Sequence, residues 1–474
     1  MPEAAIDEHR DPLLGEDDIG PDGAARGQPH RQVNPEPETV RVQGGSDRSL
    51  RARIPAPVCL HDPPTALWHP LPAGSASRSP ALAANLRGLM PTVCDERQLM
   101  PEATAPAAAD LDWNFLRTKN PPSEDSSGVQ VIDLFSSLGG LTFGAFEGLR
   151  RKGRSARLGL AVDSEPAALR VFRATLAGAE RRYACADLSA VLAHVADRTR
   201  AEERALVAPV ARGSSLLLAG PPCQGHSALN NHTRHDDPRN DLYLAVARVA
   251  RLIEPRAVVV ENVQGIGSDR RSAAQLCRAA LEELGYEVTA RRLDLSRIGV
   301  PQTRIRHVLV ATQDAEFKWE LPELPKRDLR WAIKDLLDLE GKTHLDSPPN
   351  PTPANQQRMD WLFEHGEFDL PNALRPVCHQ SDHSYRSMYG RLRWDRPAQT
   401  LTSGFGSMGQ GRYVHPLRRR TLTPHEAARL QCLPDFVAMR VEKRRTLLAT
   451  MIGNAAPPLL AARMVEALID QRLL

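Results

Sequence analysis

The sequence predicts an α/β protein with a doubly wound sheet, a small second domain and a disordered N-terminal extension. Apolar runs of strand length recur along the chain, at residues 129–135, 158–162, 216–218, 257–260 and 307–311. Segments with helical spacing of apolar residues lie between several of these runs, an alternation typical of a sheet covered by helices on both faces. Polar or reactive residues follow most runs directly, at the edge where such sheets bind ligands.

The composition excludes several classes of protein. The 474 residues suffice for two or three domains, and the net charge of +3 is too small for a polybasic tail protein. The 7 cysteines form no Cys-x-x-Cys pair, which disfavours disulfides and a zinc site, so we expect no metal. No apolar run approaches the roughly 18 residues of a membrane helix, and the acidic start does not resemble a signal peptide. We therefore expect a cytoplasmic protein without membrane contacts.

Residues 1–127 differ from the rest of the chain. They hold 18 of the 39 prolines and show little periodicity. Such a segment cannot bury enough apolar area to offset its ordering entropy, so we expect a largely disordered and dispensable extension. The alternative is a tether or DNA-binding arm that uses Arg48, Arg51 and Arg53. Residues 110–116 could be the first to dock on the folded core.

The next segment predicts a nucleotide-binding corner. A strand at 129–135, a turn of small residues at 136–141 and a helix at 142–149 follow one another. Asp163 ends the second strand, at 158–162, and Asp187 ends a third, at 183–186. Two carboxylates at successive strand ends suit a ribose and an adenine amino group, although each could instead cap a helix.

Two further helices are expected before the fourth strand. Residues 167–176 have helical spacing, and residues 191–207 form a long Ala/Arg-rich stretch that we interpret as one scaffold helix. Pro209 and Gly213 would end this helix.

A cysteine in a stiff turn is the central feature of the chain. Pro221 and Pro222 stop the strand at 216–218, because neither has an amide hydrogen to donate, and Cys223 follows at once. Gly225 allows the backbone to bend towards a partner. A buried structural cysteine is the alternative, but the prolines before it and the polar residues after it favour a nucleophile.

A polar stretch and a helical stripe come next. Residues 228–241 are polar and partly basic, as expected of a loop that closes over a bound substrate. Arg234 and Arg239 could contact phosphates, or could simply be solvated. Apolar residues with helical spacing at 242–253 predict the helix that follows.

The apolar runs at 257–260 and 307–311 also carry functional candidates. Glu261 follows the strand at 257–260, where its carboxylate could cap a helix, form an ion pair, or bind and protonate a heterocycle. Arg304 and Arg306 precede the strand at 307–311 and alternate, so on an extended chain they share one face.

The strand–helix alternation ends near residue 314. Residues 314–394 contain one helix candidate, near 328–340, and fit a small second domain. In the returning segment, Thr423, Pro424 and Glu426 form the capping signature of a helix. A last helix is expected at 459–469.

These stretches resemble the DNA cytosine-5 methyltransferases over nearly all of residues 129–474. Four motifs carry the resemblance: Pro221-Pro222-Cys223-Gln224, Glu261-Asn262-Val263, Gln302-Thr303-Arg304-Ile305-Arg306 and Gly453-Asn454-Ala455-Ala456-Pro457-Pro458. The resemblance implies a Rossmann-like methyltransferase sheet. Residues 128–313 would form the catalytic and cofactor-binding domain, 314–394 a small target-recognition region, and 395–474 the return that completes the catalytic domain.

The resemblance also implies a site. Cys223, Glu261, Arg304 and Arg306 would be catalytic, and Gln224, Ser227, Arg234 and Arg239 would contact nucleic acid. The residues expected to bind S-adenosylmethionine are Asp133, Phe135, Gly139, Gly140, Asp163, Asp187, Pro222, Leu242, Asn454 and Ala455. The family has glycine where this chain has Ser137. Serine fits there only without a strictly positive φ, so we expect Ser137 to avoid one.

The implied activity is methyl transfer to carbon 5 of cytosine in a specific duplex DNA sequence, through a covalent adduct with Cys223 and a flipped-out base. It would serve restriction-modification or epigenetic marking, in a monomer near a prokaryotic nucleoid, with any cognate restriction endonuclease acting separately. The alternatives are a tRNA cytosine-5 methyltransferase, a catalytically silent DNA-binding protein on the same scaffold, and an unrelated Rossmann enzyme with a nucleotide cofactor.

Overall fold

The computed structural model describes residues 110–176, 182–213, 215–222, 242–268, 272–380 and 387–474. The predicted nucleophile Cys223 and the predicted nucleic-acid contacts Gln224, Ser227, Arg234 and Arg239 lie outside these ranges, as does most of the N-terminal extension. In the part of the chain that is described, no helix is long and apolar enough to cross a membrane.

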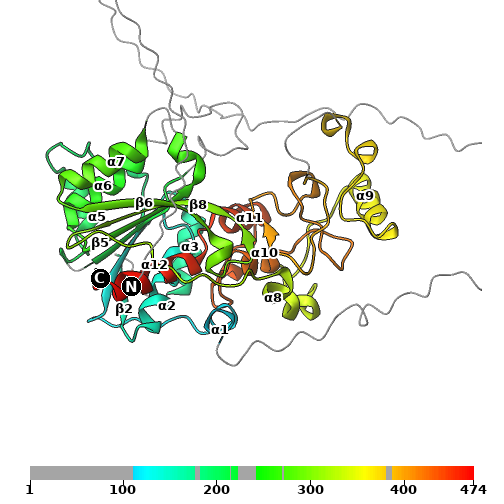
Figure 1. The fold of residues 1–474 in the computed structure, drawn as a ribbon, viewed down its shortest axis with the longest axis horizontal. Coiled ribbons are helices and arrows are strands. Elements are labelled where there is room, and N and C mark those ends of the chain that lie inside the picture. The colour runs from blue at the N-terminus through cyan, green and yellow to red at the C-terminus, as the bar shows by residue number, and fades with distance from the viewer. Residues whose placement is uncertain (1–109, 177–181, 214, 223–241, 269–271, 381–386) are drawn as a thin grey trace, which may run out of the picture. The chain divides into compact units, whose positions relative to one another are not determined.

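The sheet confirms the doubly wound architecture (Figure 1). Its strand order is β3-β2-β1-β4-β5-β8-β6. The first five strands along the chain are β1 (Val129–Leu134), β2 (Ala156–Asp163), β3 (Tyr183–Cys185), β4 (Ser215–Ala219) and β5 (Ala257–Val263). Their pairings are all parallel. The last predicted strand, β8 (Ile305–Thr312), lies antiparallel between β5 and a strand that we did not anticipate, β6 (Glu287–Asp294).

Helices cover both faces of this sheet (Figure 1). On one face, α2 (Gly140–Arg151), α3 (Pro166–Thr175) and α12 (Pro458–Asp470) pack in one apolar core with alternate residues of the strands. On the other, α6 (Leu242–Ile253) and α7 (Ala273–Glu283) form a second core with the remaining strand residues. Both faces being covered explains why the central strands read as continuous apolar runs.

Three glycines bring α2 and α12 unusually close. Gly140, Gly144 and Gly148 are four residues apart and so share one face of α2. A Cβ at Gly144 would lie 1.9 Å from the carbonyl oxygen of Pro458, and Cβ atoms at Gly140 and Gly148 would lie 2.6 and 2.7 Å from carbonyl oxygens of the facing segment. The second turn of α2, at Gly144, and the start of α12 are therefore in direct backbone contact.

Replacing Gly144 with alanine should destabilise the protein by about 1–3 kcal/mol, because overpacking at a backbone contact outweighs the gain in helix propensity of about 1 kcal/mol. Gly148→Ala should cost less, since its closest contact is 2.7 Å rather than 1.9 Å. Thermal unfolding of the full chain and both variants tests this order. A Gly144→Ala protein as stable as wild type would contradict the close contact.

A short helix before the sheet docks on the core, as expected for residues 110–116. In α1 (Leu111–Arg117), Phe115 and Leu116 are buried, and so is Asp112. The Asp112 carboxylate forms ion pairs of 2.8, 2.7 and 2.6 Å with Arg151, Arg327 and Arg463. Burial raises the pKa of Asp112, but the three arginines outweigh it and hold the pKa below its ordinary value.

The single scaffold helix expected at 191–207 is wrong. The chain forms α4 (Leu188–Val191), then an irregular segment, then α5 (Ala201–Val207). The buried guanidinium of Arg248 in α6 forms an ion pair of 2.7 Å with Glu203 of α5. The same group explains why the chain is not helical between α4 and α5. It donates hydrogen bonds to carbonyl oxygens of the irregular segment, at Val195, Asp197 and Arg198. Those carbonyls are thereby satisfied without helical geometry.

The second region is more helical than expected. The helix candidate near 328–340 begins at Asp328, whose side chain caps α8 (Leu329–Ile333), but it continues as a 3₁₀ turn, η5 (Lys334–Leu339). A further helix, α9 (Pro353–Glu364), was not predicted, although Thr352 and Pro353 form a cap and first-turn signal. A small separate core surrounds α9, built from Met359, Leu362, Leu370, Tyr389, Met408 and Val414.

The returning segment joins this region to the sheet. β9 (Ala398–Gln399) pairs in parallel with β7 (Gln302–Thr303), directly before β8. The predicted capping box is confirmed at Thr423 and Glu426, which begin α10 (Pro424–Leu430). Next come α11 (Arg445–Asn454) and α12, which confirms the last predicted helix.

Candidate active site

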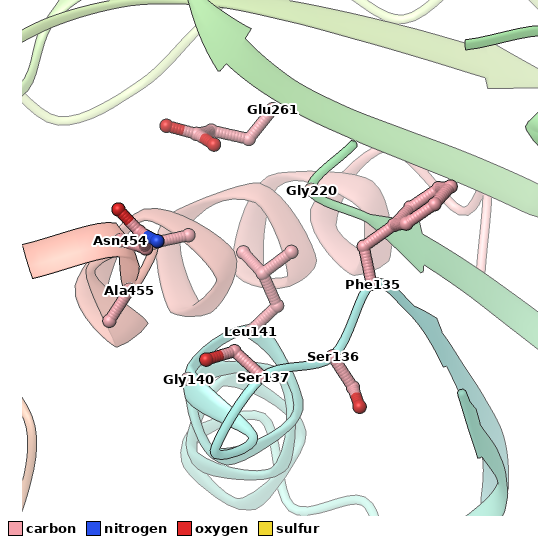
Figure 2. A pocket seen from close by; sticks show the side chains of 10 residues that line it. Phe135, Ser136, Ser137, Gly140, Leu141, Gly220, Glu261, Asn454 and Ala455 are labelled. Carbon is pink, nitrogen blue, oxygen red and sulfur yellow. The ribbon is translucent and has the colours of Figure 1, made fainter. Parts of the chain in front are cut away.

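A pocket lies at the carboxyl ends of β1, β4 and β5 (Figure 2). It encloses about 320 Å³ of empty space, part of it open to solvent. Its walls come from the β1–α2 turn, the end of β4, Glu261 of β5 and the end of α11, and the lining residues are Phe135, Ser136, Ser137, Gly140, Leu141, Gly220, Glu261, Asn454, Ala455 and Ala456. The turn after β1 and the last motif, more than 300 residues apart in the chain, therefore share one pocket.

The backbone of the β1–α2 turn alternates in handedness. Phe135, Ser137 and Gly139 have φ values of 58°, 49° and 95°. The expectation that Ser137 avoids a positive φ is wrong. Part of the reason is its amide, which donates a 2.8 Å hydrogen bond to Oδ2 of Asp163. A left-handed non-glycine residue costs roughly 1–2 kcal/mol, so this turn stores strain beside the pocket.

Asp133 and Asp163 support the turn from beneath the pocket wall. Oδ2 of the fully buried Asp133 accepts hydrogen bonds from the hydroxyl (2.7 Å) and amide (3.3 Å) of Thr142, which fixes the first turn of α2. Burial raises the pKa of Asp133 to about 7. Asp163 accepts from the amides of Ser137 and Glu165, and burial raises its pKa as well. Neither carboxylate is among the residues that line the pocket.

Asp187 has the alternative role that the sequence left open. It is exposed at the N-terminus of α4, and its Oδ1 accepts from the amide (3.0 Å) and hydroxyl (2.7 Å) of Ser189. Asp187 thus caps a helix, and its binding of an adenine amino group stays a prediction.

Glu261 enters the pocket from β5 as half of an ion pair. Its Oε1 lies 2.7 Å from Nε of Arg306, and both side chains are about 90% buried, with 10% and 11% exposed. Arg306 lies on the neighbouring antiparallel strand, opposite Val263. The pairing orients the carboxylate and compensates a negative charge that would be costly to bury alone.

Arg304 does not join that pair. It falls between β7 and β8, is buried, and donates to the carbonyl oxygens of Leu401 (3.2 Å) and Ala455 (3.3 Å). It therefore ties two parts of the returning segment, one of them the pocket wall at Ala455, to the chain just before β8. The two arginines were expected to share one face of an extended chain. They have different partners, because β7 ends before Arg304 and β8 begins after it.

Two buried glutamines were missed by the sequence reasoning. Gln302 donates to Oε1 of Gln431 (2.8 Å) and accepts from the amide of Leu401 (2.8 Å). Gln431 in turn donates to the carbonyl oxygens of Ile452 (2.8 Å) and Gly453 (3.2 Å), directly before Asn454. Their signal was weak. Gln302 belongs to a recognised motif and Gln431 follows the predicted helix α10, but the burial of a polar side chain is not visible in sequence.

The turn before Cys223 is fastened to the strand that carries Glu261. Asn262 donates from Nδ2 to the carbonyl oxygen of Pro221 at 3.4 Å. Pro222 and Leu242, both half-buried, are the described residues on either side of the segment that contains Cys223. The end of β4 is therefore held against β5 at Pro221, two residues before the predicted nucleophile in the sequence.

A doubly wound sheet with a ligand-sized pocket at its strand ends, lined by a glycine turn and a buried acid, defines an α/β enzyme of the nucleotide-binding class. Comparison with known proteins narrows this class. Residues 129–470 match the family model described as C-5 cytosine-specific DNA methylase. The chain belongs to this family, and its activity is methylation of carbon 5 of cytosine in DNA.

The relatives agree with this assignment. Type II methyltransferase M1.BsuMI of Bacillus subtilis (strain 168) is 39% identical over 359 residues, covering 73% of this chain and 82% of the relative. Type II methyltransferase M1.HphI of Haemophilus parahaemolyticus is 29% identical, covering 72% and 87%. A solved E. coli structure, assigned as a prophage-encoded DNA modification methyltransferase, has the same fold, with a TM-score of 0.51 at 20% identity over 72% of this chain and 99% of that one.

Proposed function

We propose that this methyltransferase takes its methyl group from S-adenosylmethionine and transfers it to a specific duplex DNA sequence through a covalent adduct of Cys223. The observation that carries the proposal is the pocket itself, in which the glycine turn, the buried Glu261 and the end of α11 face one space. S-adenosylmethionine would supply an electrophilic methyl group on its sulfonium sulfur.

The pocket residues suit this cofactor. Gly140 and Leu141 are the first two residues of α2, and their N–H groups have no acceptor within the helix. The helix dipole also attracts an anionic group to this end. Phe135 offers an apolar face, and Asn454 offers an amide at the pocket rim. Asp163, below the turn, would bind the ribose hydroxyls with lone pairs that its two backbone hydrogen bonds leave open.

Cys223 and Glu261 would act on the cytosine ring together. Addition of the Cys223 thiolate to carbon 6, with Glu261 protonating or hydrogen-bonding ring nitrogen 3, makes carbon 5 nucleophilic. After methylation, loss of the carbon-5 proton expels the thiolate and restores the ring. Arg306 would hold the Glu261 carboxylate in place, and Arg304 would fix Ala455 in the pocket wall.

Other predicted residues would bind the DNA and recognise its sequence. The target base has to leave the duplex to reach a pocket at the strand ends. We assign Gln224, Ser227, Arg234 and Arg239 to contacts with the DNA around the flipped base, and residues 314–394 to recognition of the sequence. Because the relatives named above are type II methyltransferases, we infer that the chain works as a monomer at the prokaryotic nucleoid, protecting DNA from a separate endonuclease.

Two measurements test this function. Purified protein with methyl-labelled S-adenosylmethionine should label duplex DNA and leave tRNA unlabelled. Bisulfite sequencing of DNA from expressing cells should show one methylated sequence context. Labelled tRNA with unlabelled DNA, or methylation without any sequence preference, would overturn the proposal.

A further inference from the structure

We propose that the hydroxyl of Ser137 binds the carboxylate of the amino-acid end of S-adenosylmethionine. The inference rests on the proposed cofactor and assigns a contact to a residue that replaces the family's glycine. Ser137 lines the pocket, and Figure 2 shows its hydroxyl on the β1–α2 turn, on a different wall from Glu261.

The Ser137 hydroxyl is available for a ligand. Among the described residues it has no hydrogen-bond partner, whereas its backbone amide is already bonded to Asp163. The neighbouring Ser136 hydroxyl is buried and also lacks a partner in the part of the chain that is described. Figure 2 shows the Ser136 hydroxyl pointing away from Glu261 and Asn454, so the Ser137 hydroxyl is the one that this wall of the pocket offers to a ligand.

The position is costly for serine. A φ of 49° is unfavourable for any residue with a Cβ and costs glycine nothing. Serine at this position is therefore strained, whereas the family's glycine would not be. What serine adds over glycine is a hydroxyl group. Strained backbone of this kind is found where a side chain meets a ligand.

The surroundings select an anionic partner for the hydroxyl. Gly140 and Leu141 present first-turn amides of the 12-residue helix α2 to the same pocket. The amides of residues 136, 137 and 139 already donate hydrogen bonds within the protein. The anion would therefore be held by the first-turn amides of α2 together with the Ser137 hydroxyl. The carboxylate is the anionic group of S-adenosylmethionine. Close to Glu261 it would be repelled, so the β1–α2 turn is its place in the pocket.

The test compares two ligands that differ only at this group. S-adenosylhomocysteine has the carboxylate, and its decarboxylated analogue keeps the ammonium group without it. Calorimetric titration of the full-length protein should show that Ser137→Ala weakens S-adenosylhomocysteine binding about tenfold, as expected for a hydrogen bond to a charged group, and leaves the analogue within about twofold. Ser137→Gly, which also removes the strain, should show the same selective loss.

Three outcomes would overturn the inference. Equal weakening of both ligands in both variants would mean that Ser137 acts only through the shape of the turn. Unchanged affinity for S-adenosylhomocysteine in both variants would exclude the contact. If wild-type protein binds neither ligand, the cofactor assignment fails as well, and this is distinguishable because no variant is needed to see it. Should Ser137→Ala fold poorly in thermal unfolding, Ser137→Gly alone decides.

Discussion

Replacing Cys223 with alanine is expected to abolish methyl transfer while DNA binding survives. The covalent route needs a thiolate that adds to carbon 6, and nothing else in the proposed chemistry makes carbon 5 nucleophilic. Removing an enzyme's nucleophile can cost on the order of 10⁶-fold in rate, so the variant should fall below detection in a labelled methyl-transfer assay. Cofactor binding should be retained, because the described walls of the pocket come from the β1–α2 turn, the end of β4, Glu261 and the end of α11.

A matched control and a trap make this prediction specific. Cys185 is an exposed cysteine that ends strand β3, and Cys185→Ala should keep wild-type turnover. A duplex with 5-fluorocytosine at the target position should form a stable adduct with wild type and none with Cys223→Ala, since fluorine cannot leave as a proton. Turnover by Cys223→Ala would exclude the nucleophile, and turnover of the fluorinated duplex without a trapped adduct would exclude the covalent route.

Local sequence patterns predicted the structure correctly where it depends on residues close together in sequence. The apolar runs gave the central strands, and Thr423, Pro424 and Glu426 gave the start of α10, because a cap is made by neighbours in sequence. The glycine turn and the last motif were expected to share a pocket, and the structure brings them together through the contact of α2 with α12.

The sequence-based predictions were wrong where the local structure depends on a residue that is distant in sequence. The break between α4 and α5 depends on Arg248, about 50 residues away, which takes three carbonyl oxygens that a continuous helix would have used. Ser137 adopts a positive φ because Asp163 on the next strand holds its amide. Arg304 and Arg306 diverge because β7 pairs with β9 while β8 pairs with the main sheet. None of these partners is visible within a local window.

Side chains that are distant in sequence also position the pocket wall at the last motif. Ala455 is held by Arg304, while Gln431 holds the backbone just before Asn454. Gln302 connects Gln431 to Leu401, so the last motif is positioned by a buried polar network that also fixes the entry to β8. Such networks are stabilising only when their members are satisfied together, which makes them specify one arrangement.

The second large effect is expected for Glu261→Gln, which should lower the rate of methyl transfer by about 10² to 10⁴-fold, the usual contribution of a general acid. Glutamine keeps the size of the side chain and can still donate a hydrogen bond to ring nitrogen 3, but it cannot deliver a proton. It also leaves Arg306 without the carboxylate that it approaches at 2.7 Å, so some loss of stability should accompany the loss of rate.

The readout has to separate chemistry from binding and from folding. The turnover number should fall while affinity for S-adenosylhomocysteine and for duplex DNA stays within a few-fold of wild type, and thermal unfolding should show a folded protein. Glu282→Gln is the matched control, because Glu282 is an exposed member of a surface ion pair with Arg278 and should leave the rate unchanged. A Glu261→Gln enzyme with wild-type turnover would show that the buried pair with Arg306 only stabilises the fold, and the acid would have to be sought elsewhere.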